Sequence, residues 1–510
     1  MARDDVLLNP STSAWSVHPD LDAALTGSAA GEAAGGATLV AVVGDADGPG
    51  DADARAALAA LGLDPDQVLA THEPRAEAGA VTTVPLPPGE HAVRRVLLVG
   101  VGGGADTDWR TAGAGVGRAT RDRGRVVHAV GATATRGALA AYVEAGVLAS
   151  WGTPRFGKDG PAVVVRPAAE AVVAGTGDAD TVDRAVARAR AQLLARNLAH
   201  TPSNTKNPAW MARQAQAVAR RTGLDVRVWD ERDLRREGFG GLVAVGQGSA
   251  TPPRLVRLDH EPVGATAATP RVVLVGKGIT FDTGGLQVKP VDGMLGMKTD
   301  MSGSAIVLAV LAACRELAVP VRVTGLLALA ENALGGGSYR PSDVVVQYGG
   351  RTVEIGNTDA EGRVVMADAL AYADAHLDPA YLVDVATLTG AARIALGRSV
   401  APVFATDAAL SDALVAAGAT TGETLWPMPL ADTYRRALDS DVADINHIAD
   451  GVGGGAVTAA LFLREFVGER RWAHLDIAGT GRSDVDAGIS AKGATGFGTR
   501  LLLRWLEEMA

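Results

Sequence analysis

The sequence has few cysteine and aromatic residues. Cys314 is the one cysteine among its 510 residues, so no disulfide can form within the chain and we expect a reducing compartment. Aromatic residues make up 4% of the chain, so Val, Leu, Ile and Ala must fill its cores, as in helices packed on parallel strands. Cys314 itself lies in an apolar run, which indicates a small buried thiol.

The chain also lacks a surplus of positive charge and a long apolar segment. Its 48 Lys and Arg residues against 58 Asp and Glu residues give a net charge of −10, which argues against a dedicated nucleic-acid binder. No apolar run reaches the roughly 18 residues that cross a membrane. Asp4 and Asp5 stand where a signal peptide needs apolar residues. We therefore expect an enzyme of the cytoplasm, with neither nucleic acid nor membrane as a partner.

The chain is long, and two apolar patterns alternate along it. A length of 510 residues allows two to four domains of roughly 100–200 residues each. Short apolar runs alternate with Ala-rich stretches of helical period, which predicts an α/β fold. We expect an N-terminal α/β domain over 1–177, with the first ~25 residues flexible, a connecting helix over 178–199, and a C-terminal domain over 200–510. The C-terminal domain should hold a mostly parallel sheet flanked by helices.

Local patterns place the elements of both domains. In the connecting helix one apolar stripe is formed by Val182, Ala185, Val186, Ala189 and Leu193. Strands are predicted over 37–44, 80–86, 93–100 and 125–131 in the first domain, and over 271–278, 321–330, 351–359 and 381–390 in the second. Two helices of the second domain carry residues 306–317 and 361–376. Ser302 or Asp300 is expected to cap the first of them.

Charged residues gather where the predicted strands of the second domain end. They interrupt segments of Gly, Thr, Ser and apolar residues, and they are Lys277, Asp282, Lys289, Asp300, Asp359, Glu361 and Arg363. Each alone would be an ordinary surface charge, but together they occupy strand ends, where parallel sheets bind ligands. Buried acids must be neutralised by bases or by metal ions. Four carboxylates beside two lysines suit a pair of divalent cations such as Mg²⁺, Mn²⁺ or Zn²⁺.

Five motifs in this region carry a family resemblance. In order along the chain they are VGKGITFDTGG, MKTDMSGSA, NTDAEGR, ATLTGA and HLDIAGT. Their order and spacing resemble the leucyl aminopeptidases, the cytosol aminopeptidases of peptidase family M17, over roughly residues 195–510. The resemblance implies a two-metal exopeptidase that hydrolyses the N-terminal residue, leucine-like or otherwise neutral, from peptides with a free N-terminus. It also implies a homohexamer built as paired trimers.

The resemblance also implies a role for each site residue. Asp282 and Glu361 would bridge two metal ions, Mn²⁺ or Zn²⁺, while Lys277 and Asp300 complete the tight site and Asp359 the exchangeable one. Lys289 and Arg363 would be the catalytic pair, with Arg363 holding a bicarbonate ion that serves as the base. The implied substrate-binding residues are Met297, as a wall of the first side-chain pocket, Asn357, Thr387 and Leu388.

Elementary chemistry agrees with these roles. Two metal ions polarise a scissile carbonyl and lower the pKa of a water that bridges them. A lysine can ligate only as a neutral amine, so a metal must lower the pKa of Lys277 well below ~10.4. Lys289 can supply positive charge to an oxyanion. Arg363 stands in the first turn of a predicted helix, where small anions bind favourably.

Two other functions stay open at this point. A two-metal phosphoester hydrolase would use the same ligand types, although no arginine-rich phosphate clamp is present. A non-catalytic scaffold or nucleotide-binding protein would work through the first domain, where Gly100, Gly102 and Ala105 loosely match a dinucleotide pattern. A tight glycine turn without a cofactor is the favoured interpretation there. None of the histidines lies in the charged loops, so we expect His447 and His474 to be structural.

Overall fold

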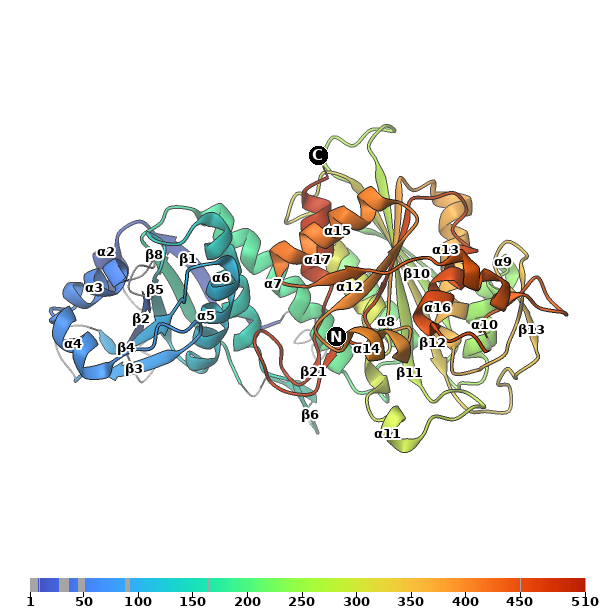
Figure 1. Cartoon of the computed structure of the whole chain (residues 1–510), viewed down its shortest axis with the longest axis horizontal. Coiled ribbons are helices and arrows are strands. Elements are labelled where there is room, and N and C mark those ends of the chain that lie inside the picture. Colours follow the sequence, from blue (N-terminus) through green and yellow to red (C-terminus); the bar gives the residue numbers. More distant parts are fainter. Residues whose placement is uncertain are drawn as a thin grey trace. The chain divides into compact units, whose positions relative to one another are not determined.

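The computed structural model, shown in Figure 1, describes residues 8, 10–26, 36–44, 51–87, 92–158, 160–163, 165–449 and 451–509. Asp4 and Asp5, which carry the expectation about a signal peptide, lie outside these residues. The chain divides into two compact units: Met1–Leu193 with Val485–Lys492, and Leu194–Asp484 with Gly493–Ala510. The division falls inside one continuous helix, α7 (Ala179–His200). Nothing in the sequence pattern anticipated that a segment near the C-terminus belongs to the first unit.

The first unit is built on a six-stranded sheet with the order β1-β8-β5-β2-β4-β3. Its strands are β1 (Ala14–His18), β2 (Ala37–Val43), β3 (Val81–Pro85), β4 (Val93–Gly100), β5 (Arg125–Ala129) and β8 (Glu170–Ala174). All neighbours run parallel except β3 and β4. Sequence analysis suggested flexibility over the first ~25 residues, whereas β1 pairs with β8 along its whole length and a helix follows it.

Helices cover both faces of this sheet. One face carries α5 (Asp106–Ala119), α6 (Arg136–Ser150) and part of α7, and the other carries α2 (Leu21–Thr26), α3 (Asp51–Ala60) and α4 (Pro65–His72). Side chains alternate along β2, so Val40 and Val42 enter the first core and Leu39 and Ala41 the second. The predicted apolar stripe of α7 is confirmed, since Val182, Ala185, Ala189 and Leu193 lie in the first core with Val186 packed against it. A short hairpin, β6 (Arg155–Gly157) and β7 (Gly160–Ala162), completes the unit.

The glycine-rich turn after β4 is a close backbone contact. A Cβ on Gly100 would lie 2.1 Å from the carbonyl oxygen of Glu77, so only glycine fits. Gly102 and Gly104 have positive φ angles of 51° and 82°, which glycine adopts without strain. Turn geometry therefore accounts for these glycines without a dinucleotide.

The second unit has an eight-stranded sheet with the order β17-β16-β19-β15-β11-β12-β10-β9. Its strands are β9 (Asp225–Trp229), β10 (Arg254–His260), β11 (Arg271–Asp282), β12 (Arg322–Asn332), β15 (Tyr381–Ala386), β16 (Ala401–Ala405), β17 (Leu425–Pro427) and β19 (Trp472–Asp476). The central strands β19, β15, β11 and β12 run parallel, and antiparallel pairs join β10, β9 and β16 to them. The predicted α/β class with a sheet rich in parallel strands is confirmed.

Smaller elements surround this sheet. A three-stranded sheet contains β13 (Val344–Val346), β14 (Thr352–Glu354) and β18 (Ile445–Asn446), and β20 (Arg482–Ser483) pairs with β21 (Gly493–Ala494). The α-helices are α8 (Pro208–Thr222), α9 (Glu231–Glu237), α10 (Gly240–Gly246), α11 (Val291–Met294), α12 (Ser302–Cys314), α13 (Glu361–Leu377), α14 (Gly390–Leu396), α15 (Ala408–Thr421), α16 (Gly455–Arg464) and α17 (Thr499–Glu507). Two 3₁₀ helices are η1 (Met297–Thr299) and η2 (Asp432–Leu438).

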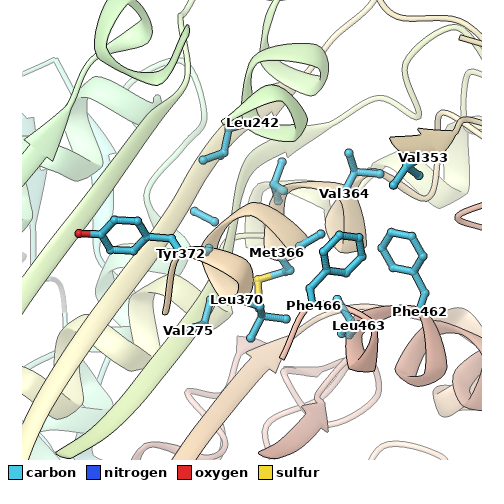
Figure 2. Close-up of a cluster of buried hydrophobic side chains, with 14 of the residues drawn as sticks. Leu242, Val275, Val353, Val364, Met366, Leu370, Tyr372, Phe462, Leu463 and Phe466 are labelled. Atoms are coloured by element: carbon cyan, nitrogen blue, oxygen red, sulfur yellow. The ribbon is translucent and has the colours of Figure 1, made fainter. Parts of the chain in front are cut away.

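Helix α13 runs through the main hydrophobic core of the second unit. Figure 2 shows Val364, Met366 and Leu370 of this helix among side chains from β11, α10 and α16. All three are 0% exposed, and burying a side chain of this size stabilises the fold by about 1.5–3 kcal/mol. Because α13 begins at Glu361, this packing fixes the position of its first turn against the sheet.

The start of α12 differs from the prediction. Neither Ser302 nor Asp300 caps the helix, because Met301 occupies the cap position and its side chain makes no capping hydrogen bond. The Ser302 hydroxyl donates instead to the carbonyl oxygen of Thr299, at 2.6 Å. The Asp300 carboxylate pairs with Lys277 at 2.8 Å, so it is engaged elsewhere. The predicted strand over 351–359 is also shorter, since only Thr352–Glu354 pairs and the rest is a loop leading to α13.

One stretch of the described residues has the length and composition of a membrane span. It runs from Val291 to Cys314. A stretch of 18 residues within it has a mean hydropathy of 1.3, and 83% of that stretch is buried inside the fold. Asp292, Lys298 and Asp300 interrupt it, so no uninterrupted apolar run contradicts the expectation from sequence. The predicted burial of Cys314 is confirmed.

Candidate metal centre and active site

Four neighbouring parallel strands of the second unit end at the same edge of the sheet. β11 ends at Asp282, β12 at Asn332, β19 at Asp476, and β15 one residue before Thr387. A register shift in the pairing of β11 with β12 brings Asp282 opposite Asn332. Loops that follow the carboxyl ends of parallel strands are the usual binding edge of such a sheet.

Glycines allow Lys277 to reach this edge. A Cβ on Gly276 would lie 2.6 Å from Cα of Ser304, and a Cβ on Gly278 would lie 2.6 Å from the Oγ of the same serine, so α12 packs directly on the strand there. Side chains alternate along β11, so Lys277 points to the opposite face, toward α13. A Cβ on Gly362 would lie 2.6 Å from Cε of Lys277, so the second residue of α13 is a glycine that leaves room for the lysine.

Lys277 joins two of the predicted metal ligands. Its Nζ lies 2.8 Å from Asp300 Oδ2 and 3.0 Å from Glu361 Oε1, and it donates to the carbonyl oxygen of Thr387 at 3.0 Å. Burial opposes the charge of the Lys277 ammonium, but Asp300 and Glu361 outweigh it and raise its pKa. Lys277 is therefore the counter-charge of two buried carboxylates here, and it can ligate a metal only after losing a proton.

Lys289 joins the other two predicted ligands. Its Nζ lies 2.8 Å from Asp282 Oδ2 and also contacts Asp359. Burial opposes the charge of the Lys289 ammonium, but Asp282 and its other acidic neighbours outweigh it, so its pKa is raised to a high value. Asp282 is 2% exposed, whereas Asp359 and Lys289 keep 33% and 15% of their side chains accessible. Lys289 thus lies on the more open side of the cluster.

Three carboxylates are close enough to share metal ions. Oxygen atoms of Asp282, Asp359 and Glu361 all lie within 4.8 Å of one another. Burial and the nearby Asp282 raise the pKa of Glu361 to about 8, and burial raises the pKa of Asp300 to about 6. These shifts mark acids with too little positive charge around them. Buried oxygen donors in excess of their lysine partners fit divalent cations, so the residues present suit a metal site.

Arg363 lies in the first turn of α13, apart from these ion pairs. It is 8% exposed, and its Nη1 donates to the carbonyl oxygen of His447 at 2.7 Å. Its Nε has no hydrogen-bond partner among the residues that the structure describes. Burial lowers the pKa of Arg363 to about 10, so the guanidinium is still charged at neutral pH. A buried cation with a spare N–H group is suited to a small anion.

Thr387 and Leu388 lie on the loop after β15, where Thr387 contacts Asp300 and Leu388 contacts Asp476. The Thr387 hydroxyl donates to Asp300 Oδ1 at 2.6 Å, while its carbonyl accepts from Lys277. The Leu388 amide donates to Asp476 Oδ1 at 3.0 Å. This loop is therefore tied to the acid cluster on one side and to the end of β19 on the other.

Asn357 and Met297 lie on two further loops of the site. The Asn357 side-chain oxygen accepts a hydrogen bond from the backbone amide of Asp359 at 2.8 Å, an Asx turn that shapes the approach to α13. Met297 is half-buried and begins η1, whose last turn leads to Asp300. Both residues adjoin a predicted metal ligand, but no contact decides their predicted roles in binding substrate.

Sequence analysis missed residues that support the cluster. Asn332 Nδ2 donates to Asp282 Oδ1 at 2.8 Å and to the carbonyl oxygen of Thr358 at 3.0 Å. The Tyr339 hydroxyl donates to that same carbonyl at 2.9 Å. Asp476, inside a quoted motif, was given no role. The available signal was position, since Asn332 and Asp476 are polar residues that end buried strands next to β11 and β15.

Comparisons with known proteins agree with this geometry. The family model described as "Cytosol aminopeptidase family, catalytic domain" matches residues 193–503 of this chain. A "Probable cytosol aminopeptidase" of Desulfovibrio desulfuricans is 51% identical over 314 residues, which is 61% of this chain and 62% of that protein. Another from Leifsonia xyli subsp. xyli is 44% identical over 391 residues, which is 74% of this chain and 78% of that protein. The match thus spans less than two thirds of the Desulfovibrio protein.

A solved structure resembles the chain over most of its length. The "Bottromycin maturation enzyme BotP in complex with Mn" superposes with a TM-score of 0.81 at 34% sequence identity, covering 92% of this chain and 98% of that one. The matching fold, the family match over more than half of the chain and the carboxylate cluster at the strand ends lead to one conclusion. The chain belongs to the cytosol aminopeptidase family.

Proposed function

We propose that the chain is a metal-dependent aminopeptidase that releases the N-terminal residue, leucine-like or otherwise neutral, from peptides with a free N-terminus. The observation that carries this proposal is the cluster of Asp282, Asp359 and Glu361 oxygens within 4.8 Å at the carboxyl ends of parallel strands. Membership of the cytosol aminopeptidase family supports it. No observation on the site favours a phosphoester hydrolase or a non-catalytic scaffold.

The cluster would hold two divalent ions, Mn²⁺ or Zn²⁺. Asp282 and Glu361 would serve both ions, Asp359 would complete the exchangeable site, and Asp300 with the neutral amine of Lys277 would complete the tight site. The resemblance to a protein solved with Mn supports Mn²⁺ as the first ion to test. Bound ions supply Lewis acidity, which polarises the scissile carbonyl and lowers the pKa of a water molecule.

Lys289 supplies positive charge to the reacting carbonyl. Contacts with Asp282 and Asp359 hold its ammonium at the open side of the cluster. As negative charge develops on the carbonyl oxygen, the ammonium donates a hydrogen bond to it. This interaction is stronger in the transition state than in the ground state, so it lowers the barrier.

Arg363 holds a bicarbonate ion that serves as the base. The bond from its Nη1 to His447 fixes one side of the guanidinium, and its Nε stays available for an anion. A bicarbonate ion held there by Arg363 would supply a general base for the attacking water and an acid for the leaving amine. Arg363 itself transfers no proton, because its pKa of about 10 keeps it charged throughout.

Thr387, Leu388, Asn357 and Met297 bind the substrate. The ties from Thr387 to Asp300 and from Leu388 to Asp476 fix the backbone that hydrogen-bonds the substrate main chain. Asn357 contacts the peptide beside Asp359, and Met297 forms a wall of the pocket for the first side chain. The protein would work in the cytoplasm as a homohexamer, which the names of the cytosol relatives and the family resemblance support.

Chelator-sensitive hydrolysis of leucine p-nitroanilide tests this proposal. We expect the purified protein to contain about two divalent ions per chain and to lose activity with them. Activity should return on adding Mn²⁺ or Zn²⁺. p-Nitrophenyl phosphate is the matched control, because it releases p-nitrophenol, which like p-nitroaniline is followed by its yellow colour, and it should not be hydrolysed. Hydrolysis of the phosphate ester alone, or of neither compound with the metals bound, would contradict an aminopeptidase. An active particle near 52 kDa by light scattering would contradict the hexamer.

A further inference from the structure

His447 lies beside the loop that leads into the site, although the two are far apart in sequence. It follows β18, which pairs in parallel with β14 through Val353↔Ile445 and Glu354↔Asn446. This register sets residue 447 alongside 355–357, just before Asp359. The two segments are in tight contact, because a Cβ on Gly356 would lie 2.6 Å from a side-chain carbon of Ile448.

The His447 ring is bonded on both sides to this loop. The Gly356 amide donates to its Nδ1 at 3.2 Å, and its Nε2 lies 2.8 Å from the carbonyl oxygen of Asn357. A neutral ring carries one proton, and an amide N–H can only face a ring nitrogen with a free lone pair. The proton is therefore on Nε2, which donates to Asn357. Nδ1 also lies 3.1 Å from the Glu354 carbonyl, but that oxygen already accepts from the His447 backbone amide.

The surroundings of the ring keep it neutral and in place. His447 is 0% exposed, and its ring packs edge-on to Phe462 of α16 at 6.4 Å between centroids. Burial, with the charge of Arg363 nearby, lowers the pKa of His447 to about 4. A charged ring could donate from Nδ1 to the Glu354 carbonyl, but its proton would also face the Gly356 N–H, and burial opposes its charge. His447 is thus a fixed hydrogen-bonding bridge and not a proton carrier.

The backbone of the same residue holds the guanidinium of the site. The carbonyl oxygen of His447 accepts from Arg363 Nη1 at 2.7 Å, and the structure gives no other hydrogen bond for that guanidinium among the described residues. The ring thus fixes the loop that carries Asn357, and the carbonyl one residue from β18 fixes Arg363. Asn357 and Arg363 each stand two residues along the chain from a proposed metal ligand.

We propose that His447 is a positioning residue for the proposed peptidase reaction, a single bridge that sets Asn357 and Arg363 in their places relative to each other. This inference rests on the proposed function for its effect on the reaction, while the bridge itself can be tested without activity. A displacement of about 1 Å in a positioning group can lower a rate about 100-fold, so the bridge matters beyond its contribution to folding.

Two substitutions divide the bridge into its halves. In His447→Asn the side-chain oxygen lies near the place of Nδ1, so it keeps an acceptor for the Gly356 amide and loses the donor to Asn357. In His447→Gln the amide nitrogen lies near the place of Nε2, so it keeps the donor to Asn357 and loses the acceptor. His447→Phe keeps a buried ring and loses both bonds. His128→Asn in the first unit is the matched control, since His128 is also buried and bonds to Tyr142 at 2.9 Å.

The holoenzyme variants are compared by hydrogen exchange, metal content, thermal unfolding and kinetics. Amide exchange in peptides covering 354–359 should speed up in His447→Gln and His447→Phe but much less in His447→Asn. His447→Phe should lower kcat about 10- to 100-fold with its metals retained. His447→Gln keeps the bond to Asn357, so its KM should stay near the native value. His447→Asn loses that bond, so its KM should rise. His128→Asn should lower the melting temperature and leave kcat within about twofold.

Three results would overturn the inference. Unchanged exchange at 354–359 in all His447 variants would mean that the ring does not hold the loop, whatever the protein catalyses. Kinetics of His447→Phe within about twofold of the native values would deny the positioning role. Loss of metal in proportion to activity would assign the residue to folding of the site. If the native protein hydrolyses no peptide substrate, the proposed function fails, and the exchange comparison still decides whether the bridge exists.

Discussion

The two units place different side chains at the ends of their parallel strands. In the first unit, the four inner strands β2, β4, β5 and β8 end at Val43, Gly100, Ala129 and Ala174, none of which ionises, and only the edge strand β1 ends at an ionisable residue, His18. In the second unit, β11, β12 and β19 end at Asp282, Asn332 and Asp476. Both units share the α/β architecture, so the architecture only provides a place for a site. Whether a site exists depends on which residues occupy that place.

The units also use their close-packed glycines differently. In the first unit, a Cβ on Gly113 of α5 would lie 2.1 Å from the carbonyl oxygen of Tyr142 on α6, so this glycine lets two helices approach. In the second unit, the glycine at position 362 lets the Lys277 side chain pass to the acids. The same steric property serves packing in one case and the site in the other. Substitutions can therefore separate folding from function.

The largest expected effect comes from removing an acid at a strand end of the second unit. Asp282→Ala or Glu361→Ala should abolish peptidase activity and lower metal content at both positions, because each removes a proposed bridging ligand. Asp180→Ala, an exposed acid of the first unit, is the control and should change neither quantity. Metal analysis and leucine anilide hydrolysis measure the effect. Full metal content in both site variants would refute the bridging assignment.

A smaller effect is expected at the two basic residues proposed for catalysis. Lys289→Ala should lower kcat by about 10²–10³, the scale for one lost partner of an oxyanion, and keep both ions. Arg363→Ala should cost less, and bicarbonate should stimulate the native enzyme but not this variant. Metal analysis and thermal unfolding of the two variants distinguish a catalytic role from a role in which Lys289 and Arg363 only neutralise the acids. If the variants lose metal together with activity, the lysine and arginine are counter-charges of the acids.

Sequence patterns were sufficient to predict the α/β architecture of both units, and most of the charged residues that they singled out lie together in the structure. The apolar stripe of α7 and the buried runs of β2, β4 and β11 are local patterns, and each formed the expected element. Motif spacing placed Lys277 and Asp300 among the site residues, and the structure brings them to 2.8 Å. Neighbouring parallel strands end at the same edge of a sheet. A charged residue at the end of each predicted strand was therefore enough to predict that these residues lie close together.

Other features depend on contacts that no local pattern encodes. The addition of Val485–Lys492 to the first unit, where Ile489 packs against a core, follows from the path of the whole chain. The uncapped start of α12 results from an ion pair that draws Asp300 toward Lys277. The bridge at His447 requires β14, which lies inside the predicted strand over 351–359, to pair with β18, whose two residues are too few to predict.

A third substitution pair separates the two uses of glycine. Gly362→Ala places a methyl group 2.6 Å from Cε of Lys277, so the lysine must move away from Asp300 and Glu361. We expect kcat/KM to fall about tenfold with little change in melting temperature. Gly113→Ala should instead cost about 1–3 kcal/mol of stability through overpacking and leave kcat unchanged. Kinetics and thermal unfolding of both variants measure these effects. Equal losses of activity in the two variants would contradict the separate roles of the two glycines.

The smallest expected effect is on how stability depends on pH, and here each unit contributes one buried histidine. In the first unit, burial lowers the pKa of His128 to about 3. In the second unit, burial opposes the charge of His474, but Asp384, at 2.5 Å from its Nδ1, outweighs burial and raises its pKa above 6.5. The two histidines should therefore affect stability at opposite ends of the pH range.

The sign follows from the protons bound in each state. Below pH 6.5 the unfolded chain protonates residue 128 and the folded chain does not, so stability falls as the pH drops from about 6.5 toward 3. For His474 the folded chain holds the extra proton, so its stabilisation is complete below pH 6.5 and is lost as the pH rises through the raised pKa. Melting temperatures of the holoenzyme across pH 4–9 should show that His128→Gln reduces the acid-side slope and His474→Gln the alkaline-side slope. Both substitutions flattening the same side would contradict the assignment, because the charge state of each histidine depends on whether its own unit places an acid beside it.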